Sequence, residues 1–563
     1  MKLFKIFLLI AFTGFLAHFF YFCDFGFYED DYAFISTSLN YPASQLLRKL
    51  NACFFYWPQG RPLGFFLPTF FTVIGSSMGD LKFVYFTGFL IIFANSLMFY
   101  LILCRIKPKS TLFAVTGMLA FLLFPADTTK PFLLHLFQLQ PSLSFLLLGY
   151  LLYLSGWTRF SYFCVTLTLL TYESFFMLFL AAPVIRCFAD SEKKDPLFQA
   201  KTVSKSRFDE MFCKYFRVSL NDFLFHSLIM AAIILCVVVI REFTGDSRLE
   251  GSGNPFQMVN KIFFGSIIGP LSSLFSFFLA IYHVAFSFQK DTLLICFILF
   301  CVFLPIFIRI QLPDKCEKSL ENRSGSLLPA SVLLLVSSYL FSFTHFPPSE
   351  LSGRGTSVHL AATFSVSFFI ALLVEMVKNN RKNTRLFSVF LAAFFSMLGG
   401  YHFIIQKDYI RSWQNQKKFW SEILETCSDI SDGTVIFVIK DRLPQTKYIL
   451  TNSWADPIVL CQLLKFPRNW KKTPKLNLVE KDWADTVVFD KGEFFWKVPE
   501  TTWLAHWDTI PDSNFILLEE SDGKICRKEG SIKISGRNLQ LKNKAKATIP
   551  EIDKGLLYRL MIQ

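Results

Sequence analysis

Charge is scarce in this chain, and several motifs that mark common protein classes are missing. Charged residues make up 18% of the 563 residues, compared with about 25% in average soluble proteins. The 13 cysteines include no CxxC pair, so the usual spacing of a structural zinc site is absent. No Walker, GxGxxG or GxSxG element stands in a suitable context. The sequence therefore argues against a zinc-stabilised fold and against these nucleotide-binding and hydrolase classes.

Apolar residues dominate instead. They make up 53% of the chain, which contains 70 phenylalanines and has a mean hydropathy of +0.41. Apolar runs of about 20 residues recur, and each is long enough to cross a bilayer. The net charge of +14 gathers in short basic runs between these segments, such as 105–109 and 378–385. This pattern follows the positive-inside rule and predicts cytoplasmic loops rather than a nucleic-acid interface.

The apolar runs predict about 11 transmembrane spans. Two of them are interrupted, 159–185 by Glu173 and 263–289 by Gly269-Pro270, and splitting both gives about 13 spans. The split version also places the charged loop 186–224 in the cytoplasm. Either count puts the N-terminus in the cytoplasm, with 3–23 as a retained anchor, and the C-terminus outside. The expected spans are 3–23, 82–104, 111–125, 137–155, 159–185, 225–243, 263–289, 291–309, 327–343, 358–377 and 386–406.

The character of the sequence changes after residue 407. Apolar runs shorten to strand length, as in Thr434 to Ile439. Ser412 to Leu424 is typical of an amphipathic helix that leaves the membrane. The predicted fold class is an all-α polytopic membrane domain over 1–406, with an outer catalytic loop at about 24–80. A small mixed α/β extracytoplasmic domain follows over 407–563.

Three consecutive acids, Glu29-Asp30-Asp31, stand directly behind the first apolar run. Carboxylates at a helix exit lie at the water boundary, where they avoid the cost of burial in lipid. One interpretation is a solvated stop signal. The other is acid–base or metal chemistry on a lipid-linked substrate, in which oxygen ligands at Asp30 and Asp31 suit a divalent cation such as Mg²⁺ or Mn²⁺.

Basic residues near these acids are candidates for binding phosphate. Arg61 lies between Gly60 and Pro62, and a guanidinium fork binds phosphate bidentately; the alternative is a surface arginine in a turn. Arg354, in a predicted outer loop, has the same potential, or caps the following helix. Glu173 lies inside an apolar run and is either functional or hydrogen-bonded to a neighbouring helix.

The arrangement of these motifs resembles the GT-C class of polytopic glycosyltransferases. The shared features are a first helix, an acidic pair just outside it, a Gly-Arg-Pro-Leu further along the same loop, many helices and a soluble C-terminal domain. The resemblance implies that an aspartate of the first outer loop acts as base, here Asp30 or Asp31, with Glu29 and Glu173 as supporting residues. The segments that carry it are Phe27–Tyr32, Gly60–Leu63, Phe124–Thr129 and Leu170–Glu173.

The expected activity is the transfer of a sugar from a polyprenyl-phosphate carrier to an extracytoplasmic hydroxyl, with inversion. Asp30 or Asp31 takes the acceptor proton, while Arg61 or Arg354 stabilises the leaving phosphate. The acceptor is a glycan, lipid or protein, the membrane lipids are further partners, and the bacterial inner membrane is the expected location. A flippase or transporter of lipid-linked saccharide and a non-catalytic scaffold are the alternatives.

Overall fold

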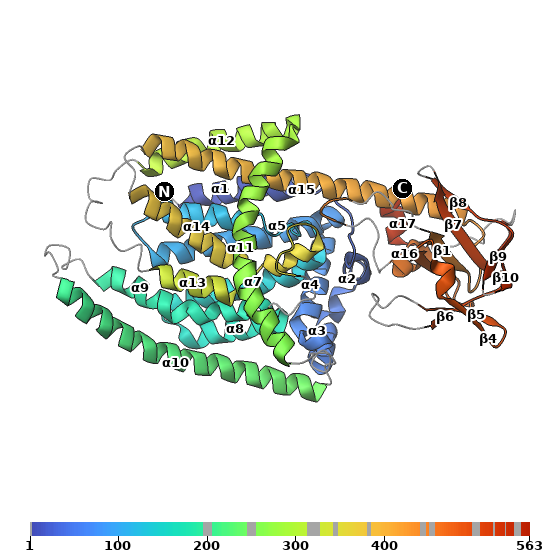
Figure 1. Ribbon diagram of the computed structural model, residues 1–563, viewed down its shortest axis with the longest axis horizontal. Coiled ribbons are helices and arrows are strands. Elements are labelled where there is room, and N and C mark those ends of the chain that lie inside the picture. The colour runs from blue at the N-terminus through green and yellow to red at the C-terminus, as the bar shows by residue number, and fades with distance from the viewer. Residues whose placement is uncertain are drawn as a thin grey trace. The chain divides into compact units, whose positions relative to one another are not determined.

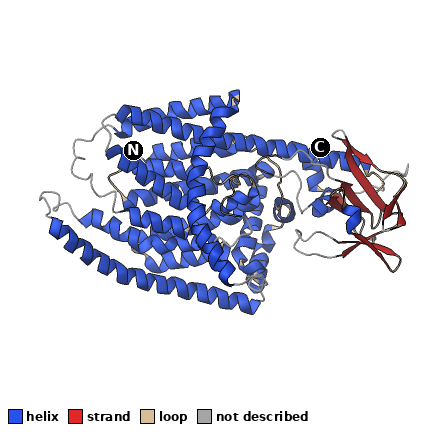
Figure 2. Ribbon diagram, in the orientation of Figure 1, coloured by secondary structure: helices blue, strands red, loops and turns tan. Residues whose placement is uncertain are grey.

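The computed structural model describes residues 3–194, 205–244, 255–311, 327–341, 347–379, 384–439, 446–449, 456–497, 507–521, 524–534, 536–544 and 553–562. The chain divides into two compact units. The helical unit comprises Met1–Asp24 and Ser38–Lys407, and the C-terminal unit comprises Phe25–Thr37 and Asp408–Gln563. Among the described residues, strands occur only in the C-terminal unit, as Figure 2 shows.

The helical unit is a bundle of apolar helices (Figure 1). Six described helices are long and apolar enough to cross a membrane, and four shorter apolar helices accompany them. The prediction of a helical polytopic membrane protein is confirmed at this level. The main helices are α1 (Leu3–Gly14), α3 (Leu46–Tyr56), α4 (Pro62–Met78), α5 (Leu81–Ile106), α6 (Thr111–Leu122), α7 (Leu133–Leu154), α8 (Thr158–Thr171), α9 (Ala182–Lys194), α10 (Lys205–Thr244), α11 (Pro255–Ser287), α12 (Lys290–Gln311), α13 (Leu328–Ser337), α14 (Ala362–Asn379) and α15 (Thr384–Thr426).

The structure changes several helix boundaries that the sequence predicts. Helix α8 ends where Tyr172 becomes extended (φ −159°, ψ 116°), and the 3₁₀ helix η4 (Glu173–Ala181) follows, so the expected split occurs there. Helix α11 contains Pro270 and still continues as one helix. The charged loop expected at 186–224 is instead helical in its described parts, within α9 and α10. Helix α4 was missed, because its apolar run lies inside the segment assigned to the outer loop.

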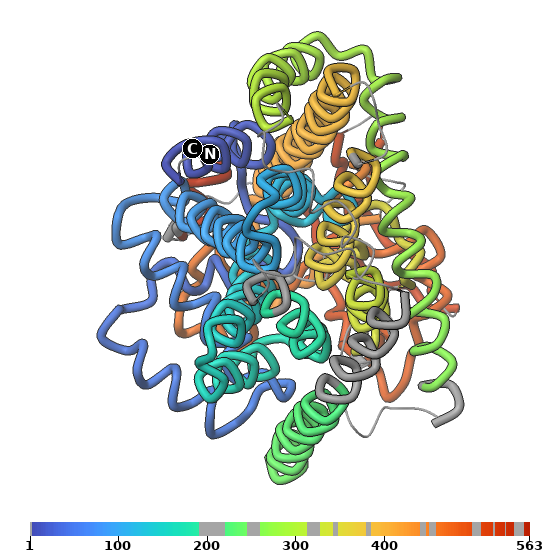
Figure 3. Tube along the Cα trace, turned by 90° about the vertical axis from the view of Figure 1, so that its left-hand side faces the viewer, coloured from blue at the N-terminus to red at the C-terminus, as the bar shows by residue number. Residues whose placement is uncertain are grey.

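The core of the helical unit lies among α5, α6, α7 and α14, where α7 packs on α5 and α8, and α6 packs on α14. Phe99 and Phe121 stack with ring centroids 4.6 Å apart, and Phe364 meets Phe99 edge-on at 5.2 Å. Helices α10, α11 and α12 lie at the periphery of the unit in Figure 3. Their large exposed side chains, such as Phe278 at 71% exposure, are typical of helices that face lipid.

The C-terminal unit is built on a four-stranded sheet in the order β3-β1-β7-β8. Strand β1 (Val435–Ile439) runs parallel to β3 (Lys475–Val479) and β7 (Phe515–Ser521), and β8 (Lys524–Arg527) is antiparallel to β7. All five residues of β1 are buried, as expected of a central parallel strand. The predicted small sheet-containing region is therefore present, and its strand at Thr434 to Ile439 is confirmed.

A second sheet and short helices complete the C-terminal unit. The aromatic rings of Phe437, Trp483, Trp496 and Phe515 form its core, where the two larger sheets meet. The half of α15 that lies in this unit contains the amphipathic helix predicted at 412–424. The remaining elements are α16 (Asp456–Leu463), β2 (Leu464–Lys465), η9 (Trp483–Thr486), β4 (Val487–Asp490), β5 (Glu493–Lys497), β6 (Trp507–Ile510), β9 (Ser531–Ile534), β10 (Arg537–Gln540), β11 (Asp553–Lys554) and α17 (Leu556–Met561).

The segment Phe25–Thr37, which the sequence assigns to the outer loop of the membrane domain, belongs to the C-terminal unit. Tyrosine hydroxyls hold it there: Tyr28 donates to the carbonyl of Tyr409 at 3.1 Å, and Tyr32 donates to Gln416. The carbonyl of Tyr32 in turn accepts from Gln462 Nε2 at 2.7 Å. The acidic segment therefore folds as part of the C-terminal unit.

Candidate functional site

A strained turn presents Arg61 in the helical unit. Trp57, Gln59 and Gly60 all have left-handed backbones, with φ of 45°, 51° and 66°. This conformation is uncommon for residues other than glycine and costs about 1–2 kcal/mol each for L-residues. Pro62 then opens α4 at its first turn, a position that suits proline. Strain of this kind persists only where the surroundings impose it, and it is concentrated at functional sites.

Arg61 forms a bidentate ion pair with Glu173, which lies 112 residues further along the chain. The Nε atom donates to Oε2 at 2.7 Å and Nη2 donates to Oε1 at 2.5 Å. The guanidinium also lies over the ring of Tyr172, 4.0 Å from its centroid. Arg61 is only 8% exposed, so the alternative of an ordinary surface arginine is wrong. Two separately predicted candidates, Arg61 and Glu173, therefore form one cluster.

Arg241 of α10 completes the cluster and was missed by the sequence analysis. Its Nη2 lies 3.8 Å from Glu173 Oε2, and its Nε and Nη2 donate to the carbonyl of Gly60 at 3.1 and 2.9 Å. A Cβ at residue 60 would overlap the Arg241 guanidinium, which is a second reason for glycine there. The available signal was a basic residue at the end of the apolar run 225–243. Two guanidiniums around one carboxylate leave this Arg61 cluster with a net charge of +1.

The N-terminal turns of α7 connect the Arg61 cluster to Arg354. A Cβ at Gly64, in the first turn of α4, would lie 3.0 Å from Gln138 Nε2 of α7, so glycine lets the two helices approach. His135, three residues before Gln138, shares the same helix face. Arg354, the first residue of η8 (Arg354–His359), lies close enough to act electrostatically on His135. Arg354 therefore lies within electrostatic range of the first turn of α7, and the start of α4 packs close to the same helix.

The loop before α7 adds more buried polar groups to this region. Thr128 Oγ1 lies 2.9 Å from Thr356 Oγ1 of η8, and it donates to the carbonyl of Gly353 at 3.2 Å. Asp127 accepts from the backbone N–H and hydroxyl of Thr129 at 2.9 and 2.7 Å. The Nζ atom of Lys130 donates to the carbonyl of Leu122 at 3.0 Å. Charged groups buried among apolar helices are costly, which makes this region a candidate site by default.

The two acids predicted to be catalytic, Asp30 and Asp31, and the predicted supporting residue Glu29 lie in the C-terminal unit, and all three are buried. Glu29, Asp30 and Asp31 are 3%, 6% and 0% exposed, so the interpretation as a solvated stop signal is wrong. Glu29 has a left-handed backbone with φ of 43°. Asp31 Oδ2 accepts the backbone N–H of Tyr28 at 3.2 Å, while its own N–H donates to the Tyr28 carbonyl at 2.8 Å. This reciprocal pair closes the turn from Tyr28 to Asp31 that leads into α2 (Asp31–Ser38).

A divalent cation at the acids stays a prediction. Adjacent aspartates supply the hard oxygen ligands that Mg²⁺ or Mn²⁺ prefers. Within the described residues, however, no three or more His, Cys, Asp or Glu side chains are grouped so that they could hold a metal. Asp31 also has one carboxylate oxygen directed at the backbone of Tyr28. The groups described around these acids thus give no complete ligand set.

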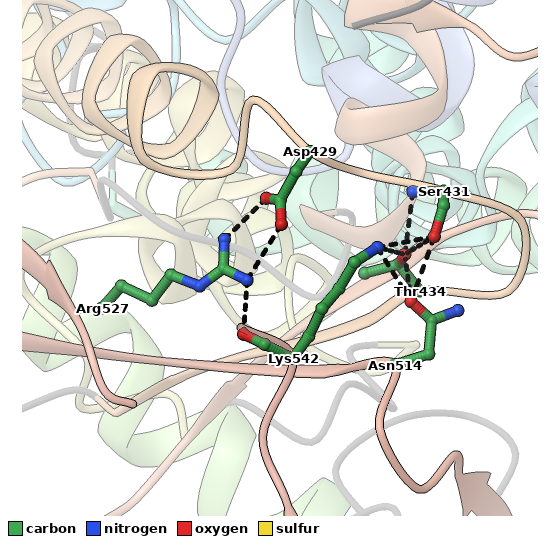
Figure 4. A network of polar contacts seen from close by, with 6 residues as sticks. All are labelled: Asp429, Ser431, Thr434, Asn514, Arg527 and Lys542. Carbon is green, nitrogen blue, oxygen red and sulfur yellow. Dashed lines mark hydrogen bonds and ion pairs between the residues drawn. The ribbon is translucent and has the colours of Figure 1, made fainter. Parts of the chain in front are cut away.

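A second buried charge network lies in the C-terminal unit (Figure 4). Arg527 binds Asp429 bidentately at 2.6 and 3.1 Å and donates to the carbonyl of Lys542 at 2.6 Å. Three neutral oxygens surround the Lys542 ammonium: Ser431 Oγ at 2.5 Å, Thr434 Oγ1 at 3.3 Å and Asn514 Oδ1 at 3.0 Å. The network joins the end of α15 to β1, β7 and β8.

The Arg61 cluster is the group of residues best suited to bind a ligand. It has excess positive charge inside an apolar unit, two guanidinium groups, an aromatic face and a strained turn. These features suit an anion that reaches a water-poor environment. Comparisons with models of protein families, with curated proteins and with solved structures found no match to this chain. The geometry of the site is therefore the basis for a functional proposal.

Proposed function

We propose that this membrane protein is a glycosyltransferase that moves a sugar from a polyprenyl-phosphate carrier to a hydroxyl on the non-cytoplasmic side of the membrane. The observation that carries the proposal is the buried Arg61–Glu173–Arg241 cluster. Lipid-linked donors keep their phosphate at the edge of the apolar phase, where a desolvated guanidinium fork binds it strongly. The arrangement of motifs that resembles the GT-C class, and that includes Arg61 and Glu173, gives further support.

The arginines stabilise the leaving phosphate. As the bond between the anomeric carbon and the phosphate oxygen breaks, its electron pair leaves with the phosphate, whose negative charge increases. A fixed guanidinium in a water-poor site stabilises this increased charge more than it stabilises the phosphodiester of the intact donor. Glu173 holds Arg61 in one orientation through two hydrogen bonds. Arg354, within electrostatic range of the first turn of α7, is a second candidate for this role.

A carboxylate of the acidic segment takes the proton of the acceptor. The acceptor oxygen attacks the anomeric carbon from the side opposite to the phosphate, which inverts the centre, and its proton passes to the carboxylate. Because the Asp31 carboxylate accepts the backbone N–H of Tyr28, we assign it a structural role and assign the base to Asp30. A divalent cation, when bound at these acids, would supply charge neutralisation for the phosphate.

A flippase or transporter of lipid-linked saccharide is the second candidate. Its specific support is the break at Tyr172, where α8 gives way to the 3₁₀ helix η4 and a buried ion pair begins at Glu173. Transporters place ionisable residues on interrupted helices of this kind. A transporter needs no general base, and this difference separates the two functions.

The test compares cells that lack the gene with cells that carry Asp30→Asn or Asp31→Asn, by their glycan and lipid profiles. Loss of a general base lowers the rate by about two orders of magnitude or more, so we expect Asp30→Asn to lose the glycan product at normal protein levels. Asp31→Asn should instead reduce the amount of folded protein. Full transfer in both single variants and in the double variant would rule out the mechanism and favour the transporter or a scaffold.

A further inference from the structure

Helix α3 has an exposed apolar face in the turn region before Arg61. Leu47, Phe54, Phe55 and Tyr56 are 69%, 38%, 81% and 76% exposed. Leu47 and Phe54 are two helical turns apart and Phe55 adjoins them, so they share one side of the helix. The buried side chain of Cys53 lies on the side on which α3 packs against α4. Large apolar side chains grouped in this way on a protein surface mark an interaction site.

The length of α3 excludes a spanning role. Its 11 residues cover about 16 Å, roughly half of the hydrocarbon core. One side of α3 packs on the protein, and the other side is exposed. A short helix with an exposed apolar face can bury that face in lipid by lying in the plane of the membrane interface.

The charges of α3 identify the surface that it suits. Arg48 and Lys49 are its two charged residues, so the helix carries +2 and no acid. Arg48 is exposed on the same side as Phe55, and Lys49 is half-buried. Basic residues beside an apolar face attract anionic headgroups. Tyr56, the last residue of α3 and 76% exposed, adds an amphipathic ring, which is typical of the interface.

We propose that α3 lies in the membrane–water interface, with its aromatic face among the acyl chains and its basic residues on anionic headgroups. The strained turn Trp57–Gly60 follows α3 directly and ends at Arg61. Docking of α3 therefore sets the depth of the Arg61 cluster at the level of the lipid phosphates. If the proposed function holds, the lipid-linked donor then enters the site laterally from the bilayer.

The test places a photoreactive residue, p-benzoylphenylalanine, at position 55 of the full chain in nanodiscs of phosphatidylcholine and phosphatidylglycerol. Two matched controls carry it at Phe278, exposed on the spanning helix α11, and at Val488, which is 48% exposed on β4. After illumination, mass spectrometry identifies the covalent lipid adducts. We expect adducts at 55 and 278 and none at 488. At 55 we expect phosphatidylglycerol to exceed its bulk share by about twofold or more.

A second arm removes the charges through Arg48→Gln with Lys49→Gln, which should abolish the enrichment at 55 and leave the adducts at 278 unchanged. No adduct at 55 when 278 reacts would overturn the proposal, as would an adduct without enrichment in the anionic lipid. The readout needs no turnover. An inactive protein that still gives the adduct therefore contradicts the transferase but not the placement of α3.

Discussion

Each unit of this protein buries an arginine–carboxylate pair joined by two hydrogen bonds, through Nε and Nη2 of Arg61 in one unit and through both Nη atoms of Arg527 in the other. In the helical unit Arg61 binds Glu173 at 2.7 and 2.5 Å, and in the C-terminal unit Arg527 binds Asp429 at 2.6 and 3.1 Å. Each pair has one further cation, Arg241 or Lys542, so each cluster has a net charge of +1. Neither the pair nor its charge therefore distinguishes a ligand site from a structural clamp.

The surroundings of the extra cation make the difference. The Lys542 ammonium is coordinated by three neutral oxygens, which replace its water. Arg241 instead shares Glu173 with Arg61 and donates to one backbone carbonyl. The Arg61 cluster also lies at a break between two helices, whereas the other network lies at the start of a regular strand. We therefore infer a ligand site in the helical unit and a clamp in the C-terminal unit.

The largest expected effect is a difference in transfer activity between substitutions at Arg61 and at Arg527. Arg61→Ala should lower transfer by about two to three orders of magnitude, the scale of a lost donor to a developing negative charge. Arg61→Lys keeps the charge and loses the fork, so it should fall between Ala and the natural residue. Arg527→Lys is the matched control and should leave turnover per folded molecule unchanged. Equal losses at Arg61 and Arg527 would make both pairs structural.

A stability measurement sharpens the same comparison. Asp429→Asn leaves a buried guanidinium without its partner and should lower the free energy of unfolding by about 3–5 kcal/mol. Replacing both residues, Asp429→Leu with Arg527→Met, should restore most of it, because apolar side chains of similar volume avoid the desolvation cost. Thermal unfolding of the full chain in detergent measures both effects. A double variant no more stable than the single one would contradict a simple clamp.

The next smaller expected effect is the loss of stability and of transfer activity when the turn before Arg61 is changed. Gly60→Ala puts a side chain on a left-handed backbone, at a cost of about 1–2 kcal/mol, and overlaps the Arg241 guanidinium. We expect lower thermal stability and weaker transfer. Adding Arg241→Ala removes the overlap but not the backbone cost, so part of the stability should return. Unchanged stability in Gly60→Ala would show that the turn is not held as described.

The smallest effect concerns Asp432, an exposed carboxylate beside the clamp. It accepts the backbone N–H groups of Lys471 and Lys472 at 2.8 and 2.7 Å, and these bonds lower its pKa. A carboxyl group with a lowered pKa in the folded state stabilises the fold above its ordinary pKa and loses that contribution as the pH falls. The Tm difference between the natural protein and Asp432→Asn should thus shrink from about pH 6 to about pH 3. A constant difference would contradict this contribution.

The sequence predicted the features that follow from local pattern. Apolar run length predicted the six described helices that are long and apolar enough to cross a membrane, and the shorter apolar runs after residue 407 predicted the strand β1. Arg61 and Glu173 each attracted attention because charge in an apolar setting is costly. Their pairing depends on how α4 and η4 pack, so no local pattern could reveal it, and the same holds for Arg241.

The acidic segment shows a different limit of sequence analysis. Three adjacent acids after an apolar run are usually solvated, and hydropathy gives no reason to bury them. The hydroxyls of Tyr28 and Tyr32 pair with groups more than 380 residues away, which brings the segment into the C-terminal unit. Long-range partners of this kind are set by tertiary packing and not by the pattern around the acids.

The most direct test of the central claim, a transferase with its phosphate site at Arg61, is the location of the lipid-linked sugar in cells that carry Arg61→Ala. A membrane-impermeant reagent that oxidises sugars distinguishes the two leaflets. The account predicts that the polyprenyl-linked sugar accumulates in the non-cytoplasmic leaflet and that the glycan product is lost. Accumulation in the cytoplasmic leaflet would instead identify a flippase, and unchanged levels of both donor and product would contradict any role of Arg61 in transfer.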